Sequence, residues 1–129
     1  MVGIVIVSHS QKLAEGVVEL AKMMSEADAP IVAAGGMEDG GFGTSFEKIY
    51  EAVDSIYADD GVAILMDMGS AVMTAEMVIE AMEDRKVMMA DGPVAEGAVV
   101  AAVEARLGSS LETVIRKVDE ARGLRKLEN

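Results

Sequence analysis

Cysteine and tryptophan are missing from this chain of 129 residues, and histidine occurs once. Without cysteine the chain forms no disulfide bonds and offers a metal ion no thiolate ligands. A single histidine also falls short of the ligand set that a zinc site needs. We therefore expect neither a disulfide framework nor a metal site.

Basic residues are scarce. Lys and Arg number 11 against 23 Asp and Glu, so the formal net charge is −12. A surface of this sign repels nucleic acid and anionic lipid, and an aromatic content of only 3% argues against base stacking. We therefore expect no nucleic acid and no membrane among the partners, but proteins with basic or mixed surfaces.

Long hydrophobic runs are missing as well. The apolar stretch 2–7 is too short to span a bilayer, and no basic region precedes it as in a signal peptide. We therefore expect a cytoplasmic protein. Hydrophobic residues still make up 51% of the chain, enough for the core of a single domain spanning 1–129.

The chain does contain a regular alternation of short apolar segments and amphipathic helical segments. This alternation predicts a mainly parallel sheet with right-handed crossovers. We expect an α/β fold, a three-layer sandwich with a four-stranded sheet in the order 2-1-3-4 and five helices. The expected strands are 2–7, 31–34, 61–66 and 86–89, and the expected helices are 10–24, 44–56, 71–82, 93–107 and 109–123.

Three of the helices carry cap signals at their N-termini, and the segment 109–112 is the one for the last helix. The cap of the first helix is either Ser10, or Ser8 with Gln11 at the third helical position of a capping box. Thr44 and Glu47 have the spacing of a capping box for the second helix. The third helix, 71–82, is apolar nearly all round, which predicts burial on two sides and favours a homodimer.

The single histidine lies where a buried strand gives way to a helix. Ligands of open parallel sheets bind at this edge, where backbone N–H groups and the helix dipole favour an anion. The same dipole disfavours an imidazolium, so a neutral ring would keep a nucleophilic lone pair. We interpret His9 as the carrier of a phosphoryl group.

A carboxylate is expected beside this histidine. If one ring nitrogen attacks phosphorus, the other must carry the proton, and an acceptor for that N–H fixes the tautomer. Asp67 follows the third strand, which neighbours the first in the predicted sheet, so the two side chains should lie together. Hydroxyls and backbone N–H groups around a phosphate are expected from Ser10, Thr44, Ser45, Gly69 and Ser70.

Other phosphate and acyl-transfer sites fit the sequence less well. A receiver domain with Asp67 as phosphoacceptor would need an acidic pair after the first strand, where Ser8, His9 and Ser10 stand instead. A phosphatase or mutase of the phosphohistidine type would need arginines on the phosphate, and the first arginine is Arg85. Ser8 and Ser10 are poorly placed for deprotonation by the adjacent His9, which excludes an acyl-transfer triad.

Four segments of the chain, in this order, resemble a known family. They are Ile-Val-Ile-Val-Ser-His-Ser at 4–10, Gly-Gly-Phe-Gly-Thr-Ser at 40–45, Asp-Met-Gly-Ser-Ala at 67–71 and Gly-Pro-Val-Ala-Glu-Gly-Ala at 92–98. Together they resemble the DhaM family, the phosphotransferase subunits of phosphoenolpyruvate-dependent dihydroxyacetone kinase, which is related to the mannose-family enzyme IIA domains. The resemblance covers nearly the whole chain.

The resemblance implies a phosphoenolpyruvate-dependent phosphotransferase without a cofactor, acting through a covalent phosphohistidine. His9 would carry the phosphate on Nε2, Asp67 would bond its other nitrogen, and Gly40, Gly41 and Gly43 would join Thr44 and Ser45 in one wall of the pocket. The donor would be the histidine-containing phosphocarrier protein. The acceptor would be ADP on the DhaL subunit, while DhaK holds dihydroxyacetone.

The resemblance also implies a homodimer. Mannose-family domains add an antiparallel fifth strand, for which this chain shows no sequence. Two other functions stay open at this point: a mannose-family enzyme IIA domain for sugar uptake, and a non-catalytic interaction module that only binds an anion in the same pocket.

Overall fold

The computed structural model describes residues 1–127, so the last two residues of the predicted domain, 128–129, lie outside the described residues. All strand pairs in the sheet are parallel, and their order is β2-β1-β3-β4, as predicted. The strands are β1 (Gly3–Ser8), β2 (Ile31–Gly35), β3 (Val62–Met66) and β4 (Val87–Ala90).

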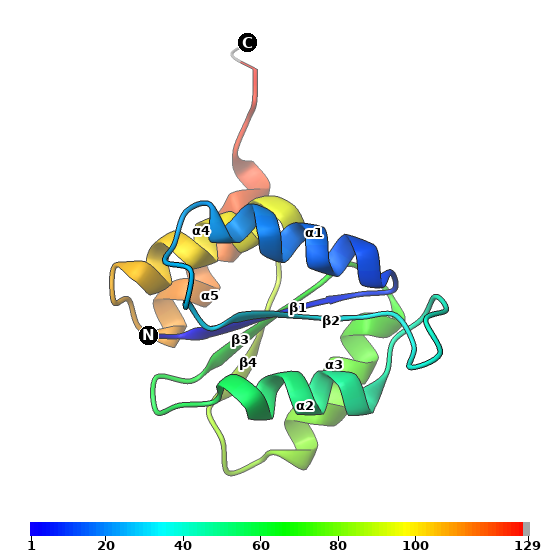
Figure 1. Ribbon diagram of the computed structural model, residues 1–129. Helices are drawn as coiled ribbons and strands as arrows, with labels where there is room; N and C mark the ends of the chain where they lie inside the picture. The colour runs from blue at the N-terminus through cyan, green and yellow to red at the C-terminus, as the bar shows by residue number, and fades with distance from the viewer. Residues whose placement is uncertain (128–129) are drawn as a thin grey trace.

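The helices form the two outer layers of the predicted three-layer sandwich. In Figure 1, α1, α4 and α5 cover one face of the sheet, and α2 and α3 cover the other. No helix of the described chain combines the length and the hydrophobicity that a membrane crossing needs. The helices are α1 (Gln11–Lys22), α2 (Phe46–Ile56), α3 (Ser70–Ala81), α4 (Val94–Arg106) and α5 (Leu111–Glu120), followed by a 3₁₀ turn, η1 (Ala121–Gly123).

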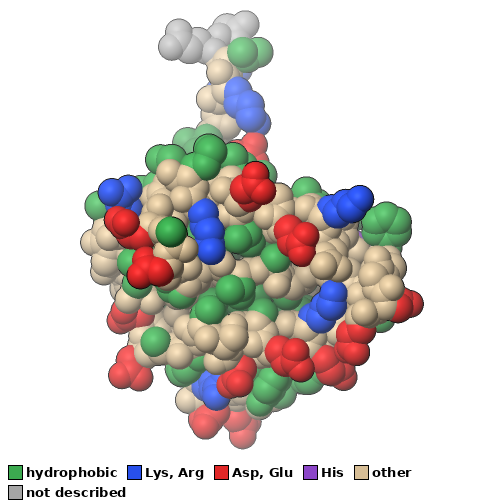
Figure 2. Space-filling model, in the orientation of Figure 1, with side chains coloured by type: hydrophobic (Ala, Val, Ile, Leu, Met, Phe, Trp, Pro, Cys, Tyr) green, Lys and Arg blue, Asp and Glu red, His purple; other side chains and the backbone are tan. Residues whose placement is uncertain are grey.

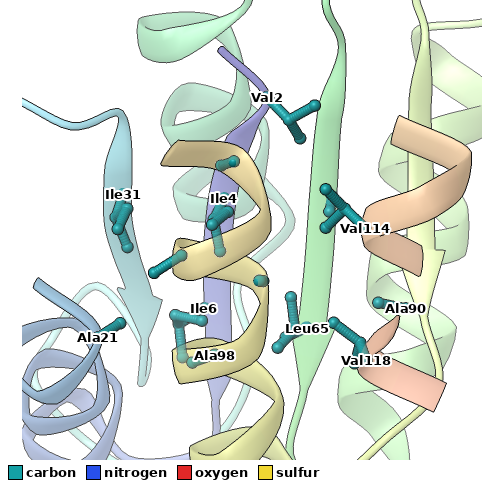
Figure 3. Close-up of a cluster of buried hydrophobic side chains, with 14 of the residues drawn as sticks. Val2, Ile4, Ile6, Ala21, Ile31, Leu65, Ala90, Ala98, Val114 and Val118 are labelled. Atoms are coloured by element: carbon teal, nitrogen blue, oxygen red, sulfur yellow. The ribbon is translucent and has the colours of Figure 1, made fainter. Parts of the chain in front are cut away.

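The central strand β1 supplies side chains to the core on both faces of the sheet. Ile4 and Ile6 point into the cluster under α1, α4 and α5, where Figure 3 shows them beside Leu65 and Ala98. Val5 and Val7 point the opposite way, toward α2 and α3. All six residues of β1 are buried, which explains why the strand shows no polar alternation.

The crossovers bring the carboxyl ends of the strands to one edge of the sheet. Ser8 pairs with Gly35 of β2, and Val7 pairs with Met66 of β3, so the residues that follow these strands converge. Packing at this edge is tight, because a Cβ on Gly35 would come within 2.6 Å of the backbone oxygen of Ser10. The start of α1 is therefore held directly against β2.

The helix caps settle one open alternative and correct one prediction. Ser10 caps α1, since its Oγ accepts from the backbone nitrogen of Leu13 at 3.1 Å. The predicted capping box of Thr44 and Glu47 is wrong. Because α2 starts at Phe46, its cap is Ser45, which accepts from the backbone nitrogen of Lys48 at 3.2 Å.

The surface carries both acidic and apolar side chains. In Figure 2, Asp and Glu side chains gather along the lower margin of the visible face, which agrees with the net charge of −12. Helix α3 is buried on the sheet side only, and its Met73 and Met77 are 68% and 56% exposed. The chain itself therefore leaves the second side of this apolar helix uncovered, and the homodimer stays a prediction.

Candidate functional site

The only histidine sits directly after β1, and both of its ring nitrogens are engaged. Nδ1 lies 2.9 Å from Oδ1 of Asp67, which directly follows β3. Nε2 lies 2.8 Å from Oγ of Ser70, the first residue of α3. The histidine side chain is 27% exposed, so an approaching molecule can reach the ring. The strand order 2-1-3-4 thus places His9 and Asp67 side by side, as the sequence predicts.

Asp67 is saturated with hydrogen bonds. Its Oδ1 accepts from His9 Nδ1 and from the backbone nitrogen of Met68 at 2.7 Å. Its Oδ2 accepts from Oγ of Ser8 at 2.9 Å and from the backbone nitrogen of His9 at 3.0 Å. Burial of this side chain, which is 12% exposed, opposes ionisation. The four hydrogen bonds together outweigh burial and hold the pKa of Asp67 below its ordinary value.

These contacts assign the tautomer of the imidazole. An ionised carboxylate can only accept, so the ring proton belongs on Nδ1. The Nε2 atom then carries the lone pair, and the Ser70 hydroxyl donates to it. This is the arrangement that a nucleophilic Nε2 requires.

The start of α3 lies against the reactive nitrogen. Gly69 precedes the helix with φ 49° and ψ −117°, and no side chain of the described residues caps the helix there. This combination of angles is far from the regions open to other residues, so the turn depends on glycine. We call Gly69 and Ser70 the open end of α3. Backbone N–H groups at such an end favour an anion.

The glycine-rich loop is attached to the site at two points. The backbone nitrogen of Gly43 donates to the backbone oxygen of His9 at 2.9 Å. Oγ1 of Thr44 lies 2.9 Å from Oγ1 of Thr74, which in turn donates to the backbone oxygen of Ser70. The loop is therefore bonded both to the histidine and to the first turn of α3.

The other predicted pocket residues have structural contacts of their own. Ser10 caps α1, and the buried Ser45 caps α2 while it donates to Glu38 at 3.3 Å. Gly41 closes the tip of the loop by donating to Asp39 at 2.8 Å. Gly40 lines a cleft of about 470 Å³ with Ser10, Gln11, Lys12, Glu15 and Phe42. Their contacts with a phosphate stay predictions.

Two residues of this network are not predicted from the sequence. The sequence offers Ser8 as a cap of α1 and as a member of the excluded acyl-transfer triad, but its hydroxyl donates to Asp67. Thr74 lies in the expected helix 71–82, which is apolar nearly all round. The signal for Ser8 was its place as a polar residue at the end of a fully buried strand. Thr74 had no such signal, because its contact with Thr44 joins segments 30 residues apart.

Within residues 1–127, no three His, Cys, Asp or Glu side chains come together in a way that could hold a metal ion. The polar groups around His9 are instead hydroxyls, backbone N–H groups and one carboxylate. This set suits an anion attached to the ring.

Comparison with known sequences gives one family match and several close relatives. Residues 3–115 match the family model EIIA-man, described as the PTS system fructose IIA component. The chain is 40% identical over 121 residues to the phosphoryl donor subunit DhaM of the PEP-dependent dihydroxyacetone kinase of Escherichia coli, with 89% of this chain but only 26% of that protein covered.

Shorter relatives match along most of their length. A DhaM subunit of Listeria innocua is 38% identical over 112 residues, covering 87% of this chain and 88% of the relative. The phosphotransferase subunit DhaM of Lactococcus lactis is 33% identical over 118 residues, covering 92% and 94%. The chain thus spans about a quarter of the Escherichia coli protein, but nearly all of these two.

Solved structures of low sequence identity share the fold. A phosphotransferase system component EIIA from Streptococcus agalactiae superposes with a TM-score of 0.73 at 16% identity, covering 98% of this chain and 97% of that one. A mannose/sorbose-specific IIA subunit from Enterococcus faecalis gives a TM-score of 0.64 at 17% identity, covering 99% and 96%. At such identities these likenesses concern the architecture alone.

Proposed function

Because the chain belongs to the EIIA-man family of phosphotransferase-system components, and within it to the DhaM subunits, we propose that it carries a phosphoryl group on His9. The observation that carries this proposal is the pair of contacts on one ring. Asp67 occupies Nδ1, and Nε2 faces the open end of α3. On this account the chain is a phosphoenolpyruvate-dependent phosphotransferase whose intermediate is phosphohistidine.

The transfer onto the ring is a displacement at phosphorus. The Nε2 lone pair of His9 attacks the phosphoryl group of a donor phosphohistidine, a P–N bond forms, and the donor's P–N bond breaks with its electron pair returning to the donor ring. The Nδ1 proton stays on His9, bonded to Asp67, whose charge offsets the positive charge of the phosphorylated ring. Phosphoryl transfer needs mainly positioning and electrostatics, which this sparse site supplies.

Ser70 changes partner when the phosphoryl group arrives. In the free protein its hydroxyl donates to Nε2 at 2.8 Å, so it must release that lone pair before the attack. The same hydroxyl can then donate to a phosphoryl oxygen. The open end of α3 would thus cover the nucleophile at rest and bind the charge after transfer.

The donor and the acceptor are proposed from the family resemblance, and the names of the relatives support only the role of a phosphoryl donor subunit in a dihydroxyacetone kinase. The histidine-containing phosphocarrier protein would supply the phosphoryl group, and ADP bound on DhaL would take it, with DhaK holding dihydroxyacetone. Phe42 and Met68, at 86% and 67% exposure, stand next to residues that bond His9 and offer adaptable apolar contacts to such proteins. Brief docking of two partners on one face suits a small, charge-steered interface.

Phosphorylation in a reconstituted system tests the proposal. Phosphoenolpyruvate, enzyme I and the phosphocarrier protein should label the wild-type chain with one acid-labile, base-stable phosphate, and His9→Ala should abolish the label. Adding ADP-loaded DhaL should then discharge it. If the wild type stays unlabelled but still binds inorganic phosphate, the chain is the anion-binding module instead.

A second candidate is a IIA component for sugar uptake, which the description of the matching family model favours. His9 and Asp67 would play the same roles, and only the acceptor would differ. Discharge of the labelled chain by a sugar-specific component, but not by ADP-loaded DhaL, would select this candidate.

The proposed active form is a homodimer in the cytoplasm. The exposed Met73 and Met77 make one side of α3 an apolar face that a second copy could cover. Sedimentation of the purified chain should give twice the monomer mass, and the variant Met77→Glu should give the mass of a single monomer.

A further inference from the structure

One buried hydroxyl at the site has no part in the chemistry described above. Ser8 is the last residue of β1 and is only 1% exposed. Its Oγ lies 2.9 Å from Oδ2 of Asp67 and 3.0 Å from the backbone nitrogen of Ser10. A polar group buried this deeply costs stability unless it is hydrogen-bonded, so these two contacts account for its presence.

The partners fix the direction of both hydrogen bonds. The backbone N–H of Ser10 can only donate, so it takes a lone pair of the Ser8 oxygen. The hydroxyl has a single proton, which is left for the carboxylate of Asp67. The hydroxyl therefore links the start of α1 to the end of β3 in one defined orientation.

The Ser8 hydroxyl contacts the carboxylate oxygen of Asp67 that does not bond the imidazole ring. Oδ2 of Asp67 is held by the Ser8 hydroxyl and by the backbone nitrogen of His9. Because the carboxylate is planar and rigid, holding Oδ2 also places Oδ1, which lies 2.9 Å from Nδ1 of His9. The position of Oδ1 in turn decides which ring nitrogen keeps the proton.

We propose that Ser8 is a positioning residue that acts through Asp67 and keeps His9 in the tautomer with its proton on Nδ1. The inference rests on the proposed function, because this tautomer is the one that presents Nε2 to a phosphoryl donor. The competing explanation is that Ser8 does no more than satisfy the backbone N–H of Ser10.

The test compares Ser8→Ala with a control variant, Ser110→Ala, which also removes one serine hydroxyl. Ser110 caps α5 by accepting from the backbone nitrogen of Thr113, on an element outside the site. Both variants lose one serine hydroxyl, and urea unfolding shows how much stability each loses. Nitrogen-15 NMR of the His9 ring then reports the tautomer without any donor protein.

Ser8→Ala should mix the two tautomers and slow phosphorylation by about five- to tenfold, the effect of one lost hydrogen bond. The pKa of Asp67 should also rise, since the Ser8 hydroxyl is one of the bonds that lower it, and a titration of the Asp67 carboxylate measures this change. Ser8→Thr, which keeps the donor, should restore both properties. Ser110→Ala should change neither.

Two outcomes distinguish a failure of the inference on Ser8 from a failure of the proposed function. A wild-type ring spectrum and phosphorylation rate in Ser8→Ala would show that Ser8 only fills a structural contact, and would overturn the inference. If the wild-type chain takes up no phosphate at all, the proposed function fails, while the ring spectra still decide what Ser8 does. Should Ser8→Thr not fold, the spectrum of Ser8→Ala decides alone.

Discussion

Two strand-to-helix junctions meet at the site, and they use their helix N-termini differently. At the junction of β1 and α1, Ser10 caps the helix with its own side chain. At the junction of β3 and α3, the described residues provide no such cap, and the backbone turns through Gly69. His9 belongs to the first junction, but its Nε2 faces the second. The capped helix end thus holds the start of α1 beside the histidine, and we expect the open end of α3 to bind the charge of a phosphate.

The largest expected effect concerns the carboxylate between the two junctions. Asp67→Asn can turn an amide N–H toward Nδ1, which would move the ring proton to Nε2 and block the nucleophile. The same exchange in a Ser-His-Asp triad produces the wrong tautomer and costs about 10⁴-fold in rate. We expect transfer to fall by about 10²-fold or more, measured as the rate of phosphate uptake, while the fold persists. Wild-type rates would remove Asp67 from the mechanism.

The next effect concerns the turn at the open end of α3. Gly69→Ala meets no atom within 4 Å but must adopt φ 49° and ψ −117°, so the cost is backbone strain of about 1–3 kcal/mol. Relief of this strain would shift Ser70, and a displacement of this kind can cost up to about 10²-fold in rate. Phosphate uptake and urea unfolding measure the two effects.

A matched control for this glycine lies at the end of α4. Gly108 also has a positive φ, 82°, and open space for a Cβ. Gly108→Ala should lose about 1–2 kcal/mol of stability with unchanged phosphate uptake. Equal loss of uptake in both variants would mean that general destabilisation, and not the turn, explains Gly69→Ala.

A smaller effect is expected at the capped junction. Ser10→Ala removes the contact with Leu13 and should reduce the free energy of unfolding by about 1 kcal/mol. Its effect on phosphate uptake should be smaller than that of Ser70→Ala, because the Ser10 hydroxyl already accepts from the helix and Ser70 touches Nε2. The opposite ranking would make the capped end the phosphate site.

The smallest effect is a dependence of stability on acid pH. Because the pKa of Asp67 is lower in the folded protein than in the unfolded chain, its carboxylate stabilises the fold above its unfolded pKa of about 3.9. This contribution is lost as the pH falls through the folded value. The difference in unfolding free energy between wild type and Asp67→Asn should be constant above about pH 5 and shrink below about pH 4. A difference independent of pH would contradict the lowered pKa.

The sequence predicts which strand-to-helix junctions meet at the site better than it predicts the hydrogen bonds that their side chains form. Periodicity and strand order place His9 beside Asp67, because both follow buried neighbouring strands. The predicted cap of α2 lies one residue before the observed one, because Thr44 and Ser45 are both good capping residues. The tertiary contact of Thr44 with Thr74, which leaves Ser45 as the cap, is not visible in the sequence. The contact of Ser8 could not be predicted for a similar reason. Its hydroxyl could also cap the adjacent helix, and its bond to Asp67 joins residues that are 59 positions apart in the sequence.

The measurement that tests the central claim most directly is the site of phosphate attachment on the ring. Nitrogen-15 and phosphorus-31 NMR of the phosphorylated chain identify which nitrogen of His9 bonds to phosphorus. Since Asp67 holds Nδ1 and the open end of α3 faces Nε2, the phosphate should be on Nε2, with Nδ1 still protonated. Phosphate on Nδ1, or on a residue other than His9, would contradict the account.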